Sequence, residues 1–218
     1  MKILAIESST SRRGVAFINN NELVWESSES LATADRTLPL IQQGLAAAGW
    51  KSGEIERVAI GLGPGSFTGV RLAIATAIGF EAVHGTPALG VRSFDALAHR
   101  LSMEGHRGRH ALVADAQRGE FALGLYSLTP EGAACAENLR LASRAELEAM
   151  AAAGIPMHGP DMPKLASHVT PRYPDAHAIA LLAGRERIFT TPGSLEPIHL
   201  RPVAFVKAPP PRFKIETS

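Results

Sequence analysis

The stretch from Gly61 to Arg71 constrains the fold more than any other part of this chain. It reads GLGPGSFTGVR and lies between a short apolar run at 58–60 and a long apolar run at 67–83. Four glycines and one proline within nine residues predict a sharp turn from a strand into a helix. The predicted turn residues, with Ser66 as the helix N-cap, are Gly61, Gly63, Pro64, Gly65, Ser66, Thr68 and Gly69.

This turn has two uses that the sequence leaves open. The first N–H groups of the helix can hold a phosphate, or the glycines can let the helix pack closely on its strand or on another chain. A dinucleotide fingerprint is incomplete, because Ser66 stands where the third glycine is required. The Gly-Lys-Ser/Thr sequence of a Walker loop is also missing.

The run at 67–83 predicts a helix with apolar residues on every side, interrupted after Val70 only by Arg71, Thr76, Gly79 and Glu81. A helix without a polar face must be covered all round. Its uncharged run is too short to cross a bilayer, which takes about 20 residues. We therefore expect one side to pack on its own sheet and the other to meet a second element, from this chain or another.

The remaining pattern predicts an α/β protein. Strands are expected at 2–7, 14–18, 23–26, 57–62 and 87–91, with helices at 36–48 (N-cap Asp35) and 94–103 (N-cap Ser93). The second half predicts strands at 111–114, 120–126, 137–141 and 155–158, and helices from Ser143 to about 153 and at 176–188. We predict two mixed-sheet units, residues 1–105 and 106–218, the second ending in an extended proline-rich tail around 208–211. No internal repeat is visible by eye.

Composition limits the kinds of partner and the cellular compartment that we expect. The net charge of +1 gives no global case for nucleic-acid binding. Cys135, the single cysteine, excludes an internal disulfide and suits a reducing compartment. Glu7 ends the first apolar run too early for a signal peptide. We expect a cytoplasmic protein that is not in a membrane.

Two carboxylates at predicted strand ends are candidates for binding magnesium and phosphate. They are Glu7, followed by Ser9 in a polar turn, and Asp115. The alternative, which we favour, is that both acids cap turns. Glu7, Ser9 and Asp115 are therefore weak candidates for contact with a nucleotide.

The histidines predict no metal site. His106 and His110 are four residues apart, as in a zinc-binding helix, but Gly108 weakens a helix and two arginines repel a cation. We therefore predict a solvated loop at 106–110. The other histidines are scattered along the chain: His84, His99, His158, His168, His177 and His199.

Four stretches together carry a family resemblance. Residues 2–10, 61–71, 115–120 and 196–201, in this order, resemble the TsaB (YeaZ) family. The resemblance covers most of the chain and is strongest in the glycine turn. It implies an actin-like (ASKHA, ribonuclease-H-like) fold of two related α/β units. It also implies a role in making threonylcarbamoyladenosine in tRNA, at the adenosine beside the anticodon.

The resemblance further implies a non-catalytic subunit. TsaB proteins are similar to TsaD, which holds a metal in its active site, but Ser93 and Leu97 stand where TsaD has its histidine pair. No catalytic residue, metal or tightly bound cofactor is expected, and the complex would use ATP through a partner. The implied partners are TsaD, the ATPase TsaE, a second copy of this chain when TsaD is absent, and tRNA through the complex.

The family pairs through its first two helices, here 36–48 and 67–83. The second is the helix whose sequence independently requires cover on every side. The predicted partner interface is Leu38, Ile41, Leu45, Phe67, Val70, Arg71, Ile74, Ala75 and Ile78.

Two other functions remain open at this point. One is a metal- or ATP-dependent enzyme on the same fold, either a glycoprotease-like peptidase or a phosphotransferase. The other is a self-contained homodimer with an unrelated scaffold role.

Overall fold

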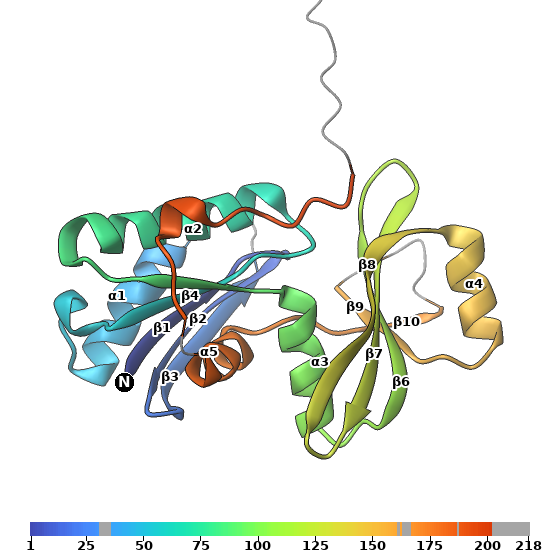
Figure 1. Ribbon diagram of the computed structural model, residues 1–218, viewed down its shortest axis with the longest axis horizontal. Helices are drawn as coiled ribbons and strands as arrows, with labels where there is room; N and C mark the ends of the chain where they lie inside the picture. The colour runs from blue at the N-terminus through green and yellow to red at the C-terminus, as the bar shows by residue number, and fades with distance from the viewer. Residues whose placement is uncertain (31–35, 161, 163–166, 187, 202–218) are drawn as a thin grey trace, which may run out of the picture.

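The computed structural model describes residues 1–30, 36–160, 162, 167–186 and 188–201. The predicted N-cap Asp35 and the predicted tail around 208–211 lie outside the described residues. Strands and helices are mixed along the chain, as in an α/β protein (Figure 1). The helices are α1 (Thr37–Ala48), α2 (Phe67–His84), α3 (Ser93–Met103), α4 (Arg144–Ala152) and α5 (Ala176–Arg185), with short 3-10 turns η1 (Ser52–Glu54) and η3 (Pro192–Ser194).

The strands form two five-stranded sheets of the same design. The first has the order β3-β2-β1-β4-β5 and the second β8-β7-β6-β9-β10. In each sheet the first three strands in sequence are antiparallel neighbours, and the last two join in parallel. The strands are β1 (Lys2–Glu7), β2 (Arg12–Asn19), β3 (Glu22–Ser30), β4 (Arg57–Gly61), β5 (Ala88–Val91), β6 (Gly108–Asp115), β7 (Glu120–Thr129), β8 (Gly132–Ser143), β9 (Met157–Gly159) and β10 (Val169–Pro171). This duplicated topology is the actin-like fold.

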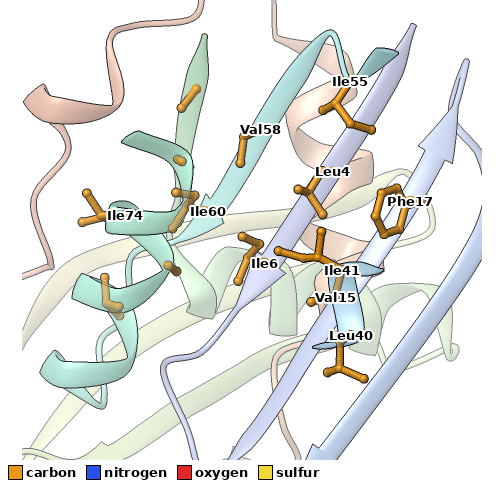
Figure 2. Close-up of a cluster of buried hydrophobic side chains, with 14 residues drawn as sticks. Leu4, Ile6, Val15, Phe17, Leu40, Ile41, Ile55, Val58, Ile60 and Ile74 are labelled. Carbon is orange, nitrogen blue, oxygen red and sulfur yellow. The ribbon is translucent and has the colours of Figure 1, made fainter. Parts of the chain in front are cut away.

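The first sheet is buried on both faces because β1 carries apolar side chains in both directions. Leu4 and Ile6 point to one side, where Ile41 of α1 and Ile74 of α2 pack over them (Figure 2). Ile3 points to the other side, where α5 packs. Successive side chains of a strand face opposite sides, so this apolar strand requires a helix layer on each.

Helices connect the two sheets. Phe94, Leu97 and Leu101 of α3 pack with β6 and β7 of the second sheet. Helix α5 follows the second sheet in sequence but packs on β1 and β2 of the first sheet. The predicted division between residues 105 and 106 therefore separates the sheets, while the later chain returns to the first sheet. The exact bounds of the two units stay a prediction.

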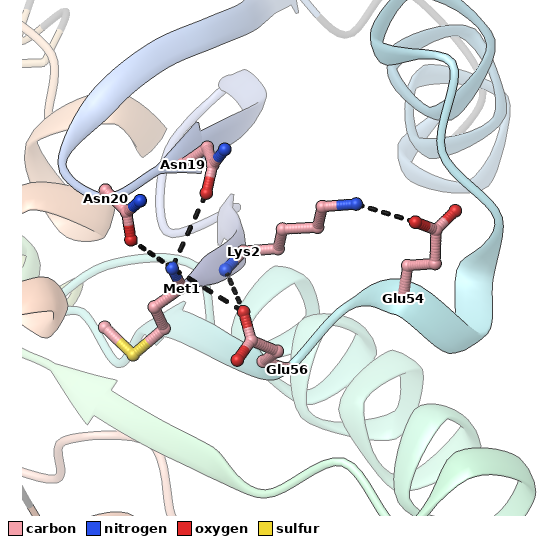
Figure 3. Close-up of polar contacts among 6 residues, drawn as sticks. All are labelled: Met1, Lys2, Asn19, Asn20, Glu54 and Glu56. Carbon is pink, nitrogen blue, oxygen red and sulfur yellow. Dashed lines mark hydrogen bonds and ion pairs between the residues drawn. The ribbon is translucent and has the colours of Figure 1, made fainter.

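The start of β1 is held by polar contacts (Figure 3). The amino group of Met1 donates to the side chains of Asn19, at the end of β2, and Asn20, in the β2–β3 turn. The backbone N–H of Lys2 donates to Glu56, and the side-chain ammonium of Lys2 lies 2.7 Å from the carboxylate of Glu54 in η1. Strand β1 is thereby aligned with both of its neighbours.

The predicted caps Ser66 and Ser143 are confirmed, since each hydroxyl accepts the backbone N–H three residues later. Ser93 is instead the first residue of α3, and Arg92 is its N-cap. Strand β10 was not predicted, because it lies in a proline-rich region with little periodicity. In the part of the chain that the structure describes, no helix is long and apolar enough to cross a membrane.

Candidate functional site

The glycine turn is packed directly against the loop between β1 and β2. A Cβ atom at Gly65 would lie 2.1 Å from the carbonyl oxygen of Ser9, and one at Gly69 would lie 1.9 Å from that of Ser8. Real side chains cannot approach so closely. Ser9 also accepts the backbone N–H of Ser66 at 2.6 Å. The glycines are thus required for close packing of α2 on this loop.

Glu7 is fully buried beneath the same turn. Its carboxylate accepts the backbone N–H of Ser9 at 2.6 Å and the hydroxyl of Ser93 at 2.7 Å. A Cβ at Gly61 would lie 2.0 Å from that carboxylate. Burial away from water raises the pKa of Glu7 because it disfavours the charged form.

These contacts favour the packing use of the turn over the phosphate use. Carbonyl oxygens of Ser8 and Ser9 already face the start of α2. An anion would meet the negative ends of these dipoles and a buried carboxylate. The predicted nucleotide contact of Glu7 and Ser9 therefore has a structural alternative in which both residues hold the loop.

Asp115 is exposed at the end of β6 and caps its own turn. Its carboxylate accepts the backbone N–H of Gln117 at 2.6 Å. Arg201 closes this turn from the other end of the chain: its guanidinium donates to Glu120 at 2.6 Å and to the carbonyl of Ala116 at 2.8 Å. Two of the stretches that carry the family resemblance thus meet here.

The segment at 188–201 forms a strap along the molecule (Figure 1). It pairs with β5 through Thr190 and Ala88. Further on, the N–H of Ile198 donates to the carbonyl of Leu62, and the ring of His199 lies 4.9 Å from that of Phe67. The strap connects the first sheet, the glycine turn and, through Arg201, the turn after β6.

Helix α2 has one covered side and one uncovered side. Val70, Ala73 and Ala77 are buried against the sheet. On the other side, a shallow groove of about 570 Å³ runs between α1 and α2. We call it the α2 groove, and its apolar lining is Leu38, Leu72, Ala75, Gly79, Phe80 and Val83.

The predicted interface residues divide between this open side and the core. Leu38, Phe67, Arg71, Ala75 and Ile78 are exposed, and Leu45 is half-buried.

Three members of the predicted interface need correction. Ile41, Val70 and Ile74 are buried in the core of the first sheet, at 4%, 1% and 8% exposure. They lie on the sides of α1 and α2 that face the sheet, so they are buried within this chain. The sequence could not distinguish the two sides, since both are apolar.

Ser93 and Leu97, where the family resemblance led us to expect the counterparts of a histidine pair, have structural contacts. Ser93 is fully buried, and its hydroxyl also accepts the N–H of Gly63 at 3.0 Å. Leu97 is 1% exposed within the core of α3, β6 and β7. Neither side chain has the chemistry or the exposure of a metal ligand.

Three histidines come together elsewhere, at the start of β6. The predicted solvated loop at 106–110 is wrong for His110, which lies on β6 and is only 4% exposed. His158, on the neighbouring strand β9, is equally buried, and the two rings are 3.0 Å apart, from Nδ1 of His110 to Nε2 of His158. His106 completes the group, with one nitrogen of each ring within 4.8 Å of the others. His158 is 48 residues from His110, so spacing along the sequence could not reveal the group.

A polar cleft of about 690 Å³ lies between α3, α5 and the ends of β2 and β3. Its charged residues are balanced: Arg12, Arg100 and Arg172 against Glu26, Glu104 and Asp175. Neither Glu7 nor Asp115 lines it. The cleft therefore does not join the predicted nucleotide candidates.

The family model, the curated relatives and the solved structures that resemble this chain agree with one another. The model of the TsaD family, described as tRNA N6-adenosine threonylcarbamoyltransferase, matches residues 30–179. The tRNA threonylcarbamoyladenosine biosynthesis protein TsaB of Escherichia coli (strain K12) is 32% identical over 123 residues, which cover 55% of this chain and 52% of that protein. The chain thus spans about half the length of this curated relative.

Two solved structures from Pseudomonas aeruginosa match nearly the whole chain. One, described as an uncharacterized protein with similarity to peptidase YEAZ, superposes with a TM-score of 0.76 at 26% identity and covers 92% of this chain and 99% of its own. The other, described as YeaZ, has a TM-score of 0.73 at 25% identity, with 91% and 99% covered.

Proposed function

The chain belongs to the TsaB (YeaZ) family, and from this premise we propose that it takes part in making threonylcarbamoyladenosine in tRNA. Its role is that of a non-catalytic subunit. It binds a TsaD-type protein, which transfers the threonylcarbamoyl group, and it acts together with the ATPase TsaE. The tRNA reaches this chain only through the complex.

The α2 groove is the observation that carries this proposal. It places several large apolar side chains in solvent on one side of one helix, including Leu72 at 38% exposure and Val83 at 74%. A contiguous apolar surface of this kind is typical of a protein interface. Ala75 and Gly79 are small and one helical turn apart, so a helix of the partner can approach the backbone between the larger side chains.

The lack of catalytic groups at the matching position supports a subunit role. Ser93 and Leu97 cannot replace two imidazoles as metal ligands. The partner then supplies the chemistry, and this chain stabilises the partner's working conformation through contacts made only in that state. When the partner is absent, the same apolar groove pairs two copies of this chain.

Reconstitution tests this proposal. The purified chain is mixed with a TsaD-type protein, TsaE, ATP, threonine, bicarbonate, the enzyme that makes the threonylcarbamoyl adenylate, and unmodified tRNA. We expect modified adenosine only when this chain is present, and co-elution of the chain with the TsaD-type protein. Full modification without this chain would contradict the proposal.

A further inference from the structure

We propose that His106, His110 and His158 bind a divalent transition-metal ion of the zinc, cobalt and nickel class. This site is separate from the α2 groove, and it does not depend on the proposed function. It ties the segment after α3 to strands β6 and β9 of the second sheet.

Pairing of two strands places the two buried ligands. His158 on β9 lies opposite Leu112 on β6. Its ring contacts that of His110, which is two residues before Leu112 on the same strand. Two nitrogens bound to one tetrahedral zinc ion lie about 3.3 Å apart, given zinc–nitrogen bonds of about 2.0 Å. The 3.0 Å separation of His110 Nδ1 and His158 Nε2 is close to this value.

The third ligand is the one with freedom to adjust. His106 is partly exposed and follows the end of α3, and its ring lies 5.6 Å from that of His110 and 5.3 Å from that of His158. Its ligand atom is within 4.8 Å of the other two. A small movement of this one side chain closes the three nitrogens around an ion. Water completes the coordination.

The hydrogen bonds around His110 prepare it as a ligand. Its Nε2 lies 3.1 Å from the carbonyl oxygen of Arg107, which can only accept, so the proton is on Nε2, and in the metal-free protein the lone pair of Nδ1 accepts the Nε2–H of His158 at 3.0 Å. Histidine ligands of metals are commonly oriented in this way by a backbone carbonyl. For His158, binding through Nε2 selects the tautomer with its proton on Nδ1. The ion therefore replaces the hydrogen bond between the two rings, and the proton of His158 moves to Nδ1, which has no partner among the described residues.

The guanidinium groups of Arg107 and Arg172, which lie close to the site, are held by oxygen acceptors. The guanidinium of Arg107 donates to the carbonyl oxygens of Ser102 and His106. That of Arg172 lies 3.8 Å from the carboxylate of Glu104. Imidazole nitrogens without carboxylate or thiolate partners suit first-row transition metals such as zinc and nickel rather than magnesium or calcium.

Titration of the full chain with single metals tests the proposal. The tag-free protein is treated with a chelator, and Zn²⁺ or Co²⁺ binding is measured by calorimetry, by thermal unfolding and by the visible absorption of four-coordinate Co²⁺. The variants are His106→Ala, His110→Gln and His158→Gln. His168→Ala, which removes an exposed histidine outside the group, is the matched control.

We expect one ion per chain in the wild type and in the control, with a raised Tm. Each of the other variants should bind at least 100-fold more weakly and lose the Co²⁺ absorption bands. His106→Ala decides the outcome if the buried variants fail to fold, because its side chain is partly exposed. Binding by His106→Ala equal to that of the control, or a wild type that takes up no ion, would overturn the site.

Discussion

The hydroxyl of Ser93 donates a hydrogen bond to the buried carboxylate of Glu7 at 2.7 Å, across 86 residues of sequence. The same hydroxyl accepts the N–H of Gly63 from the glycine turn. One side chain thus fixes the start of α3 against the end of β1 and against the turn that begins α2. The start of α3 is therefore part of the structural framework.

Ser93→Ala should destabilise the fold by about 1–3 kcal/mol, because it leaves the Gly63 N–H and one Glu7 oxygen buried and less well paired. Denaturant unfolding measures the change. Ser127→Ala, at an exposed position on β7, is the matched control and should change stability by less than about 0.5 kcal/mol. Equal stability of the two variants would show that the Ser93 contacts contribute little.

The Glu7→Gln variant should change how stability depends on pH. Burial raises the folded-state pKa of Glu7 above its ordinary value of 4.5, so the folded protein keeps this proton to higher pH than the unfolded chain. The contribution of Glu7 is therefore most favourable below about pH 4.5 and is lost as pH rises through the folded pKa. Unfolding of wild type and Glu7→Gln across this range should show the wild type falling relative to the variant. Parallel curves would exclude a raised pKa.

Two glycines on the same helix should respond oppositely to alanine. Gly69→Ala should cost about 1–3 kcal/mol, because its Cβ would collide with the carbonyl of Ser8. Gly79→Ala should add up to about 1 kcal/mol of stability, since its Cβ meets nothing within 4 Å and alanine favours helix. Thermal unfolding of both variants checks the pair. A stable Gly69→Ala would contradict the close packing of the turn on the β1–β2 loop.

His158 should make the metal-free protein sensitive to acid. Burial lowers the pKa of His158 from 6.5 to about 4, so the folded state binds this proton less readily than the unfolded chain. The contribution of His158 to stability is fully present above about pH 6.5 and falls by on the order of 3 kcal/mol as pH approaches 4. In the presence of a chelator, His158→Gln should show a smaller loss over this window. An identical loss in both proteins would mean that other groups cause it.

Local patterns predicted the first sheet and its helices well. Apolar strands, the glycine turn and the hydroxyl caps Ser66 and Ser143 depend on neighbouring residues, which the sequence displays directly. The repeat of the same strand order in the second sheet was predicted only by the family resemblance, because the two halves share topology without evident sequence similarity. The packing of α5 on the first sheet is also a long-range contact, which local sequence patterns cannot predict.

For the candidate sites too, the sequence predicted what depends on neighbouring residues and missed what depends on the fold. The all-apolar character of 67–83 predicted a partner surface, but it could not assign Val70 and Ile74 to the core side and Ala75 and Ile78 to the open side. The histidine group depends on strands β6 and β9 being neighbours. The sequence feature that pointed toward this group was the predicted strand at 155–158, which ends at His158.

Affinity for a purified TsaD-type protein tests most directly whether the open side of α2 is a partner surface. Ala75→Glu and Ile78→Glu place a charge on exposed positions, so the isolated chain should fold normally. The matched control is Val24→Glu, at an exposed position on β3, away from the α2 groove.

Calorimetry or light scattering should show that both α2 variants bind the partner at least about 100-fold more weakly, because an unpaired charge buried in an interface costs about 3 kcal/mol or more. The Val24→Glu control should bind like the wild type. Wild-type affinity in both Ala75→Glu and Ile78→Glu would contradict the assignment of this helix as the partner surface.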